Sequence, residues 1–425
     1  MARSFHTTAF FLTLCISLCS AESGFALEKS DKNCAACHKE RVTGVHAKQK
    51  CETCHAPNKE HYDKAADFSV SAKGCLNCHA EYAGIIESPM VHRSSEKVFV
   101  DKTYGRVDGQ FWNKNCQNCH VLSCMNCHDG GNPHAIKKPT TANCQECHRD
   151  YYTGIEYSGL GQREDHERYS RGKEYKGGKY ASMLPDVHHE KGMQCGECHS
   201  MKSLAEGRKF SKTCTDCHDM KKSSSVEHSI AGHSRMECYT CHSAWANQEY
   251  GTFWIYLQNT KFSEYFRWVK RPHIDYAKSS HTKQYADFPI GVNGRKKYSP
   301  LRPQYIAFLT NIKDDKVVGR ENNMLSADFR AVFPHTVRRE TVMCESCHAD
   351  ARRLMREKRE DRLYLTDKDG LPFESFYNFK GFKVVNGRFV NDSEYKRITT
   401  KNIEYKKAAM KKWRQVTDTV ENAEK

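Results

Sequence analysis

The sequence contains few hydrophobic residues and almost no long hydrophobic run. Only 38% of its 425 residues are hydrophobic, whereas 28% are charged. That supply is small for a conventional core, since a chain of this length ordinarily forms two or three domains. Beyond the N-terminal segment, no apolar run reaches the roughly 20 residues that a membrane-spanning helix needs. We therefore expect no internal membrane span.

The one marked apolar run, residues 9–19, is itself too short to cross a membrane. It follows Arg3 and precedes small residues at 24–26, a pattern typical of a secretion signal. We expect a signal peptide at residues 1–26, cleaved after Ala26, with a retained anchor as the alternative. The protein is then secreted to the periplasm, the cell surface or the medium.

The sequence also lacks a spare cysteine. Two of its 22 cysteines lie in the expected signal peptide, and all the others fall in ten C-x-x-C-H units, so none is left for a disulfide. The paired cysteines are Cys34 and Cys37, Cys51 and Cys54, Cys75 and Cys78, Cys116 and Cys119, Cys124 and Cys127, Cys144 and Cys147, Cys195 and Cys198, Cys214 and Cys217, Cys238 and Cys241, and Cys344 and Cys347.

A histidine follows the second cysteine in every unit. These histidines are His38, His55, His79, His120, His128, His148, His199, His218, His242 and His348. A disulfide framework, common in secreted chains, accounts for the even number of cysteines but not for the histidines. C-x-x-C-H is the attachment site of c-type haem, in which both sulfurs bond to the porphyrin and the histidine is the proximal iron ligand. We therefore expect ten c-type haems.

Haem changes how the charge is interpreted. The formal net charge is +15, which by itself favours a nucleic-acid partner. Ten haems, however, add about 20 propionate charges near neutral pH. The basic residues then neutralise propionates, and we expect no nucleic-acid partner. Haems would also fill much of the interior, so that folding depends on the cofactor.

The second iron ligand separates electron transfer from catalysis, because two protein ligands leave no position for a substrate. Twelve histidines of the expected mature chain lie outside the units, slightly more than ten haems require. His189 and His281 stay open, and we expect only one of His188 and His189 to bind iron, because adjacent side chains point in different directions on a regular backbone. The distal candidates are His46, His61, His92, His134, His166, His188, His228, His233, His273 and His335.

The units are irregularly spaced, which excludes a solenoid of fixed period. We expect a mainly α fold with much irregular structure, packed around haems, and a small β-containing lobe near the C-terminus. The expected segments are the signal peptide at 1–26, a six-haem region at 27–148, a polar loop and three haems at 149–242, an aromatic-rich lobe without haem at 243–343, and the tenth haem, a hairpin and a C-terminal helix at 344–425.

Three patterns predict local structure in the last two segments. Residues 304–312 form an apolar stretch typical of a strand, followed by a polar turn and a second short strand at 317–318. Within 383–390, Asn386 and Gly387 indicate a hairpin turn. Residues 393–424 have the charged, amphipathic pattern of a helix.

Two stretches carry specific expectations about function. Units 116–120 and 124–128 are separated by three residues, too few to hold two haems far apart, so we expect a fixed junction there. Residues 163–171 form a dense polar patch. We interpret this patch as a solvated face that neutralises propionates, and the alternative is an anion pocket above a haem with a weak sixth ligand.

With its ten units over residues 34–348, the chain resembles multihaem c-type cytochromes of metal- and sulfur-respiring bacteria. The stretches 163–172, 184–199 and 232–246 are similar to such periplasmic or surface cytochromes. The resemblance implies an electron relay in anaerobic respiration rather than an enzyme. Its partners would be redox proteins: a quinol-linked membrane cytochrome, an outer-membrane conduit or other cytochromes.

Other functions stay open. One is a reductase of a sulfur or nitrogen oxyanion at one unusual haem. The C-x-x-C-K site of pentahaem nitrite reductase does not occur here. Octahaem tetrathionate reductases, however, resemble proteins whose units are all C-x-x-C-H, so the motifs alone do not exclude that type. Two alternatives remain. The protein is either a subunit of a polymerising filament, or a subunit docked through residues 243–343 to a quinol-oxidising cytochrome b.

Overall fold

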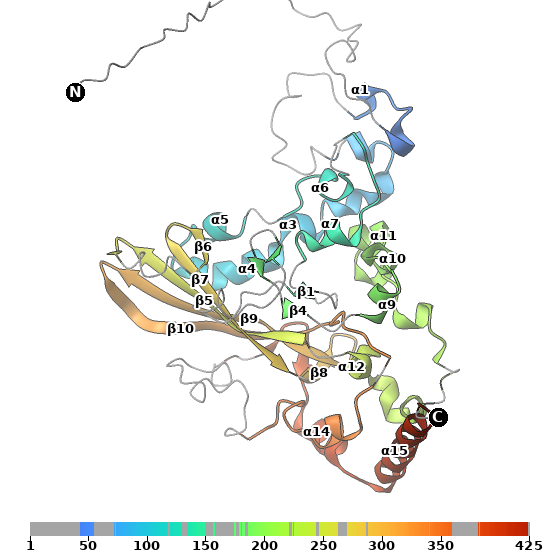
Figure 1. Ribbon diagram of the computed structural model, residues 1–425. Helices are drawn as coiled ribbons and strands as arrows, with labels where there is room; N and C mark the ends of the chain where they lie inside the picture. The colour runs from blue at the N-terminus through green and yellow to red at the C-terminus, as the bar shows by residue number, and fades with distance from the viewer. Residues whose placement is uncertain are drawn as a thin grey trace, which may run out of the picture.

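The computed structural model combines many short helices with one large mixed sheet (Figure 1). The described residues are 43–54, 72, 74–117, 120–129, 134–148, 156–157, 174–175, 178–179, 181–182, 186–220, 223, 225–243, 246–261, 270–285, 288–339, 341–358, 381 and 383–423. The expected signal peptide, the first unit at 34–38 and the polar patch at 163–171 lie outside them. No helix in the described ranges has the length and apolar character that a bilayer crossing needs.

Most helices have only one or two turns, since Gly, polar caps and the units themselves interrupt the chain. In the N-terminal half these are η2 (Gly44–His46), α1 (Cys51–Cys54), η4 (Ala80–Ile85), α3 (Pro89–His92), α4 (Ser94–Lys102), η5 (Tyr104–Arg106), α5 (Phe111–Asn115), α6 (Met125–His128) and α7 (Thr141–Gln145). Two short ladders follow, β1 (Glu156–Tyr157) with β4 (Ala181–Ser182) and β2 (Glu174–Tyr175) with β3 (Gly178–Lys179).

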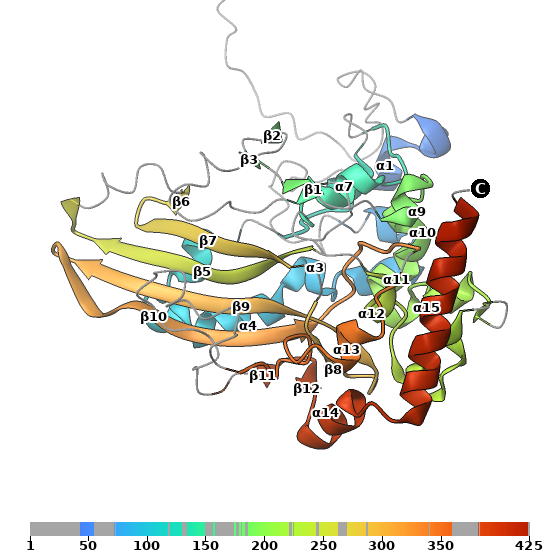
Figure 2. The same ribbon diagram turned by 60° about the horizontal axis from the view of Figure 1, so that its bottom comes forward.

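The later helices are also short until the C-terminus. They are α9 (Val187–Glu190), α10 (Cys195–Cys198), α11 (Met201–Glu206), η7 (Arg208–Phe210), η8 (Cys214–Asp216), η10 (Val226–Ser229), η11 (Ala231–Arg235), α12 (Tyr239–His242), α13 (Glu345–His348), α14 (Asp392–Thr399) and α15 (Ile403–Ala423). The helix predicted at 393–424 is therefore two helices, separated at residues 400–402. In both views the sheet extends to one side of the short helices and α15 lies on the other (Figures 1 and 2).

Residues 243–343 supply most of the sheet. Its strands are β5 (Ala246–Gln258), β6 (Lys270–His273), β7 (Tyr276–Tyr285), β8 (Ile290–Asn293), β9 (Tyr298–Lys313), β10 (Lys316–Ala331), β11 (Lys383–Val384) and β12 (Gly387–Phe389). The order is β11-β10-β9-β5-β7-β6, and β8 pairs with both β9 and β12. The β5–β9 and β10–β11 pairs are parallel, and the other pairs are antiparallel.

The predicted strand, turn and strand at 304–318 are confirmed as the β9–β10 hairpin, but the prediction was too short. The turn residues Asp314 and Asp315 have φ of 49° and 59°, the left-handed values of a two-residue hairpin loop. Both strands have 16 residues. The predicted second strand ended at residue 318, because the residues that follow it, 319–321, are polar and exposed and so gave no strand pattern. The prediction of a mainly α fold with a small lobe is corrected to a mixed fold.

The predicted hairpin at 383–390 is wrong in its pairing. The chain does turn between β11 and β12, but β11 pairs with β10 and β12 pairs with β8. The side chain of Asn386 explains the difference. Its Oδ1 accepts from Ala331 N at 2.8 Å and its Nδ2 donates to Ala331 O at 3.0 Å, which fixes the turn to the end of β10. A Cβ at Gly387 would meet Val292 O at 2.1 Å, so only glycine permits this approach.

Both faces of the sheet are buried near its centre, where aromatic side chains alternate. Phe253 and Phe308 stack on one face, with ring centroids 4.3 Å apart. On the opposite face, Trp254 and Tyr276 pack with Phe111 of α5 in a cluster that also contains residues of α4. Successive residues of a strand point to opposite faces of the sheet. The consecutive residues Phe253 and Trp254 therefore pack into the clusters on the two opposite faces. The helices α4 and α5 thereby attach the region of the C-x-x-C-H units to the sheet.

Candidate functional site

Each completely described C-x-x-C-H unit forms a single helical turn. In the units at 75, 124, 144, 195, 214, 238 and 344, the histidine N–H donates to the carbonyl of the first cysteine at 2.8–3.1 Å. Residues three and four apart lie on one face of such a turn. Both sulfurs and the imidazole therefore point to the same side, which is the geometry that attachment of a planar ring requires.

Five of these unit histidines face a second histidine at a nearly constant distance. The ring-centroid distances are 6.2 Å for His79 and His46, 6.0 Å for His218 and His188, 6.3 Å for His199 and His335, 6.1 Å for His242 and His228, and 6.3 Å for His348 and His233. All five partners are among the predicted distal candidates. The structure thus brings together a proximal and a distal candidate five times.

This spacing suits one metal ion between two imidazoles. Ligating nitrogens about 2 Å from an ion on opposite sides lie about 4 Å apart, and adding about 1.2 Å from each nitrogen to its ring centre gives about 6.4 Å in all. Ordinary aromatic contact also permits such distances. However, the interplanar angles range from 26° to 73° while the distance hardly changes. Two imidazoles on opposite sides of one ion can rotate about the line that joins them without changing the distance between their centres. In ordinary ring packing, by contrast, the distance between the centres varies with the angle between the planes.

The Nδ1 atoms of several of these rings form hydrogen bonds to other parts of the protein. His233 Nδ1 donates to Glu227 O at 3.1 Å, and His242 Nδ1 donates to Arg338 O at 3.2 Å. His348 Nδ1 donates to Ile398 O in α14. Because a carbonyl only accepts, Nδ1 carries the proton and Nε2 keeps its lone pair. This is the usual arrangement for metal-ligating histidines.

Asp186 holds two distal candidates at once. It caps α9, accepting from His188 N at 2.8 Å, and its Oδ1 lies 3.0 Å from His188 Nδ1. Its other oxygen accepts from Val337 N at 3.0 Å, two residues after His335. His335 has φ of 52°, a left-handed value that is uncommon for a non-glycine residue and that the surrounding contacts must maintain. Sequence reasoning missed Asp186, although an aspartate before a short helix is a recognisable cap.

Burial keeps several of these imidazoles neutral. It lowers the pKa of His233 and His242, and it lowers the pKa of His335 to about 4. Burial likewise lowers the pKa of His199, the partner of His335. A neutral imidazole has the lone pair that a metal needs, so both members of the pair formed by His199 and His335 are suited to ligation at neutral pH.

Cysteines of successive units also meet in space, in an alternating pattern. First cysteines approach within hydrogen-bonding contact in the pairs Cys75 with Cys124, Cys144 with Cys195, and Cys214 with Cys238. Second cysteines lie close enough to interact electrostatically in the pairs Cys127 with Cys147, Cys198 with Cys217, and Cys241 with Cys347. The units at 75, 124, 144, 195, 214, 238 and 344 therefore follow one another as a row, in which the unit at 116 is passed over.

Hydrogen bonds also join three of the six neighbouring pairs of units in this row. Thr141 Oγ1, beside Cys144, accepts from Cys195 N at 3.3 Å. Lys212 N, just before the next unit, donates to Cys198 O at 3.0 Å. Arg353 donates to both Thr240 O and Ser346 Oγ, joining the last two units. Adjacent units are thus fixed to one another by the protein as well as by their thiol contacts.

Other predicted ligands are not brought to a unit histidine by the described contacts. His92 lies 3.4 Å from Glu87, His273 lies 3.5 Å from Asp275, and His134 O accepts from Thr43 N. These three stay predictions. His38, His55, His61 and His166 lie outside the described residues, as do the side chains of His281 and Cys119. Within the described ranges, no three or more His, Cys, Asp or Glu side chains gather into a chelating group, so these histidines meet in pairs.

Comparison of the chain with protein-family models, with curated proteins and with solved structures found no match.

Proposed function

We propose that this protein is a secreted decahaem c-type cytochrome that relays electrons along a row of bis-histidine haems. The observation that carries the proposal is the set of five histidine pairs with ring centres 6.0–6.3 Å apart. Each pair joins the histidine of a C-x-x-C-H unit to one from elsewhere in the chain. Neither a disulfide framework nor a solvated polar surface gives a reason for that arrangement.

The residues fit the group that the units imply. The one-turn units present two sulfurs and an imidazole on one face, so they would hold the haem covalently, and the unit histidine and the second histidine would both bind its iron. A haem held in this way supplies a one-electron Fe(III)/Fe(II) couple. The chain itself brings the two histidines together at these five units, and with both of them bound to the iron no position would be left there for a substrate. These features favour electron transfer over catalysis there.

The row of units gives the relay its path. Contacts between Cys75 and Cys124, between Cys144 and Cys195, and between Cys214 and Cys238 keep neighbouring attachment points close. The proposed partners are redox proteins at either end of this row, a quinol-linked membrane cytochrome on the donor side and an outer-membrane conduit or other cytochrome on the acceptor side. The proposed location is the periplasm or the cell surface.

The strongest competing interpretation uses the same thiol contacts. In a secreted chain, thiols as close as those of Cys75 and Cys124 are candidates for a disulfide. The two interpretations differ in mass and in reactivity. Intact mass spectrometry of the secreted protein should give the mature chain plus ten haems, unchanged by reductant and without thiols that react with an alkylating agent. A mass without haem, or thiols that appear on reduction, would contradict the proposal.

A further inference from the structure

Four apolar side chains are exposed along one side of α15. Ile403, Met410, Trp413 and Val420 are between 52% and 71% exposed. They follow one another at spacings of seven, three and seven residues, and at 3.6 residues per turn such positions share one face of a helix. Single apolar residues on a surface are common, whereas a row of them marks an interaction surface. We call these four residues the apolar stripe of α15.

The rest of the protein contacts α15 on a different face. The centre of the Tyr405 ring lies 5.0 Å from that of the His348 ring. Lys412 follows seven residues later and therefore on the same face as Tyr405. It forms an ion pair with the buried carboxylate of Glu227 and donates to Thr341 Oγ1 at 3.0 Å. Figure 2 shows α15 at the side of the molecule that lies away from the sheet. These contacts fix the helix with its apolar stripe turned outward.

The apolar stripe is complementary to itself. Ile403 and Val420 lie equally far from its middle, and so do Met410 and Trp413. A second copy of α15 that lies antiparallel across the first therefore sets each Ile403 against a Val420. It likewise sets each Met410 against a Trp413. A two-fold dimer requires this property, because both copies use the same surface. In a parallel pair, each of these residues would instead face its own equivalent.

The charges at the two ends of α15 also favour the antiparallel arrangement. Lys406 and Lys407 lie near its N-terminal end, and Asp418 and Glu421 lie near its C-terminal end. An antiparallel pair brings the cations of one copy near the carboxylates of the other, whereas a parallel pair brings like charges together. An anionic lipid surface would attract the N-terminal end but repel the carboxylates, so a second copy fits the entire helix better.

We propose that α15 is a dimer interface, on which a second copy of this chain docks its own α15 in the antiparallel orientation. The assembly closes at two copies, because both use the same face, whereas a filament needs two different faces. Tyr405 places α15 beside His348, in the last unit of the row. The dimer therefore brings the ends of two rows to one pair of helices, a consequence that rests on the proposed relay.

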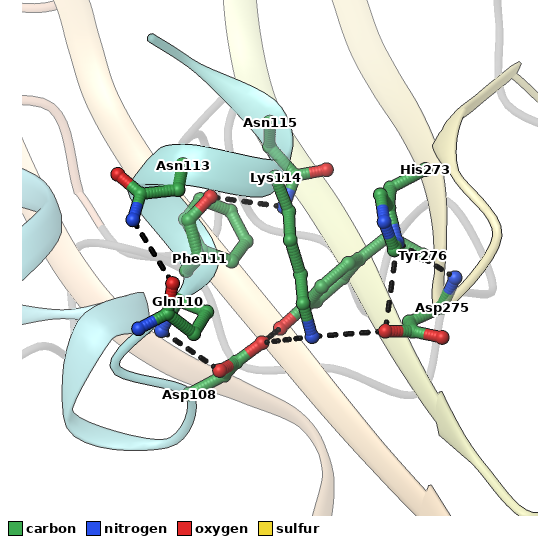
Figure 3. A network of polar contacts seen from close by, with 9 residues as sticks. All are labelled: Asp108, Gln110, Phe111, Asn113, Lys114, Asn115, His273, Asp275 and Tyr276. Carbon is green, nitrogen blue, oxygen red and sulfur yellow. Dashed lines mark hydrogen bonds and ion pairs between the residues drawn. The ribbon is translucent and has the colours of Figure 1, made fainter.

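An exposed isoleucine outside α15 supplies the matched control. Ile274 is 76% exposed in the turn between β6 and β7. Polar contacts of its neighbours fix that turn: Asp275 N donates to His273 Nδ1 at 3.2 Å, and Lys114 donates to Asp275 at 2.9 Å (Figure 3). Ile274→Lys therefore introduces a charge at a comparably exposed position without removing these hydrogen bonds.

The experiment is analytical ultracentrifugation of the mature, haem-loaded protein at micromolar concentrations. The wild-type protein should sediment as a dimer. Met410→Lys should raise the dissociation constant on the order of a hundredfold or more, because each of the two copies places a charge in the middle of the buried stripe. Ile274→Lys should leave the dissociation constant unchanged. A wild-type monomer, or an equal loss of dimer in Ile274→Lys, would overturn the inference.

Mixing two variants tests the antiparallel pairing itself. Trp413→Glu, like Met410→Lys, should be monomeric alone. In an equimolar mixture of the two, one layer of the antiparallel pair keeps Met410 against Trp413, and the other joins the introduced lysine to the introduced glutamate. The mixture should therefore recover a dimer that contains one copy of each variant. If no mixed dimer forms, the antiparallel interface is wrong.

Two further measurements separate the remaining outcomes. Flotation with vesicles that contain an anionic phospholipid tests the lipid surface. A wild-type monomer that binds these vesicles, with binding lost in Trp413→Glu, would assign the stripe to lipid and overturn the inference. Haem absorbance of the same samples tests the relay. A monomer with ten haems would refute the interface alone, whereas a dimer without covalent haem would refute the relay proposal alone.

Discussion

His188 and His189 are adjacent in α9, and comparing substitutions at the two positions tests whether His188 is an iron ligand. The His188 ring faces His218 at 6.0 Å and is held through Nδ1 by Asp186, whereas no described ring contact joins His189 to a unit histidine. His188→Ala should leave one iron without a second histidine and produce one high-spin ferric haem per chain. His189→Ala, the matched control, should keep the wild-type spectrum. Equal high-spin signals in both variants would contradict the assignment.

Asp186 permits a prediction about two irons from one substitution. Its carboxylate holds both His188 and the segment of His335, and losing such a buried acceptor costs about 1–3 kcal/mol. Asp186→Ala should therefore weaken ligation at two haems, seen as a rise in high-spin absorbance at both the His218 and the His199 sites. Asp101→Asn, an exposed carboxylate paired with Lys97, is the control. A change at only one haem would show that Asp186 does not act on both.

The residue scale also shows the limit of sequence reasoning. Counting histidines identified the distal candidates, and five of them meet unit histidines in the structure. The pairing itself was not predictable, because His335 reaches His199 from a distant part of the chain. The Nδ1 acceptors of His233, His242 and His348 were not predictable either, since they are backbone carbonyls, which every residue possesses.

At the scale of elements, α14 is fixed by an ion pair whose carboxylate is buried. Arg388 of β12 donates to both carboxylate oxygens of Glu394, at 2.6 and 2.8 Å, and the Glu394 side chain is only 7% exposed. These hydrogen bonds lower the pKa of Glu394 to about 2 from its ordinary value of 4.5. Because α14 supplies the carbonyl of Ile398 to His348, this pair supports the tenth unit.

The pH dependence of stability follows from that shift. A carboxylate whose pKa is lower in the folded state stabilises the fold above its unfolded pKa, and the contribution is lost as pH falls from about 4.5 toward 2. Arg388 is half exposed, so we expect about 1–3 kcal/mol. Denaturant unfolding should show Glu394→Gln destabilised by this amount at pH 7, with the difference vanishing near pH 2. Glu404→Gln, exposed in α15, should match wild type at both pH values.

The elements also differ in how far the sequence predicted them. The β9–β10 turn was predictable because two aspartates between strands adopt left-handed φ values locally. The partner strands of β11 and β12 were not, because side-chain contacts from Asn386 to Ala331 decide them. Local chemistry specifies turns, whereas strand order depends on residues far apart in the chain.

At the scale of the whole molecule, the structure arranges seven units as a row and sets a sheet beside it. The alternation of first-cysteine and second-cysteine contacts along that row extends from Cys75 to Cys347. The sequence predicted only one adjacency, between units 116–120 and 124–128. The other adjacencies arise from the fold, and hydrogen bonds outside the thiols join the units at 144 and 195, at 195 and 214, and at 238 and 344.

The central claim is that the chain carries ten haems with two histidine ligands each. Quantitative electron paramagnetic resonance of the fully oxidised, secreted protein tests it most directly, because ligand number sets the spin state of ferric haem. We predict low-spin signals alone, with total haem amounting to ten per chain. A substantial high-spin component in the wild-type protein, or the absence of haem signals, would contradict the account.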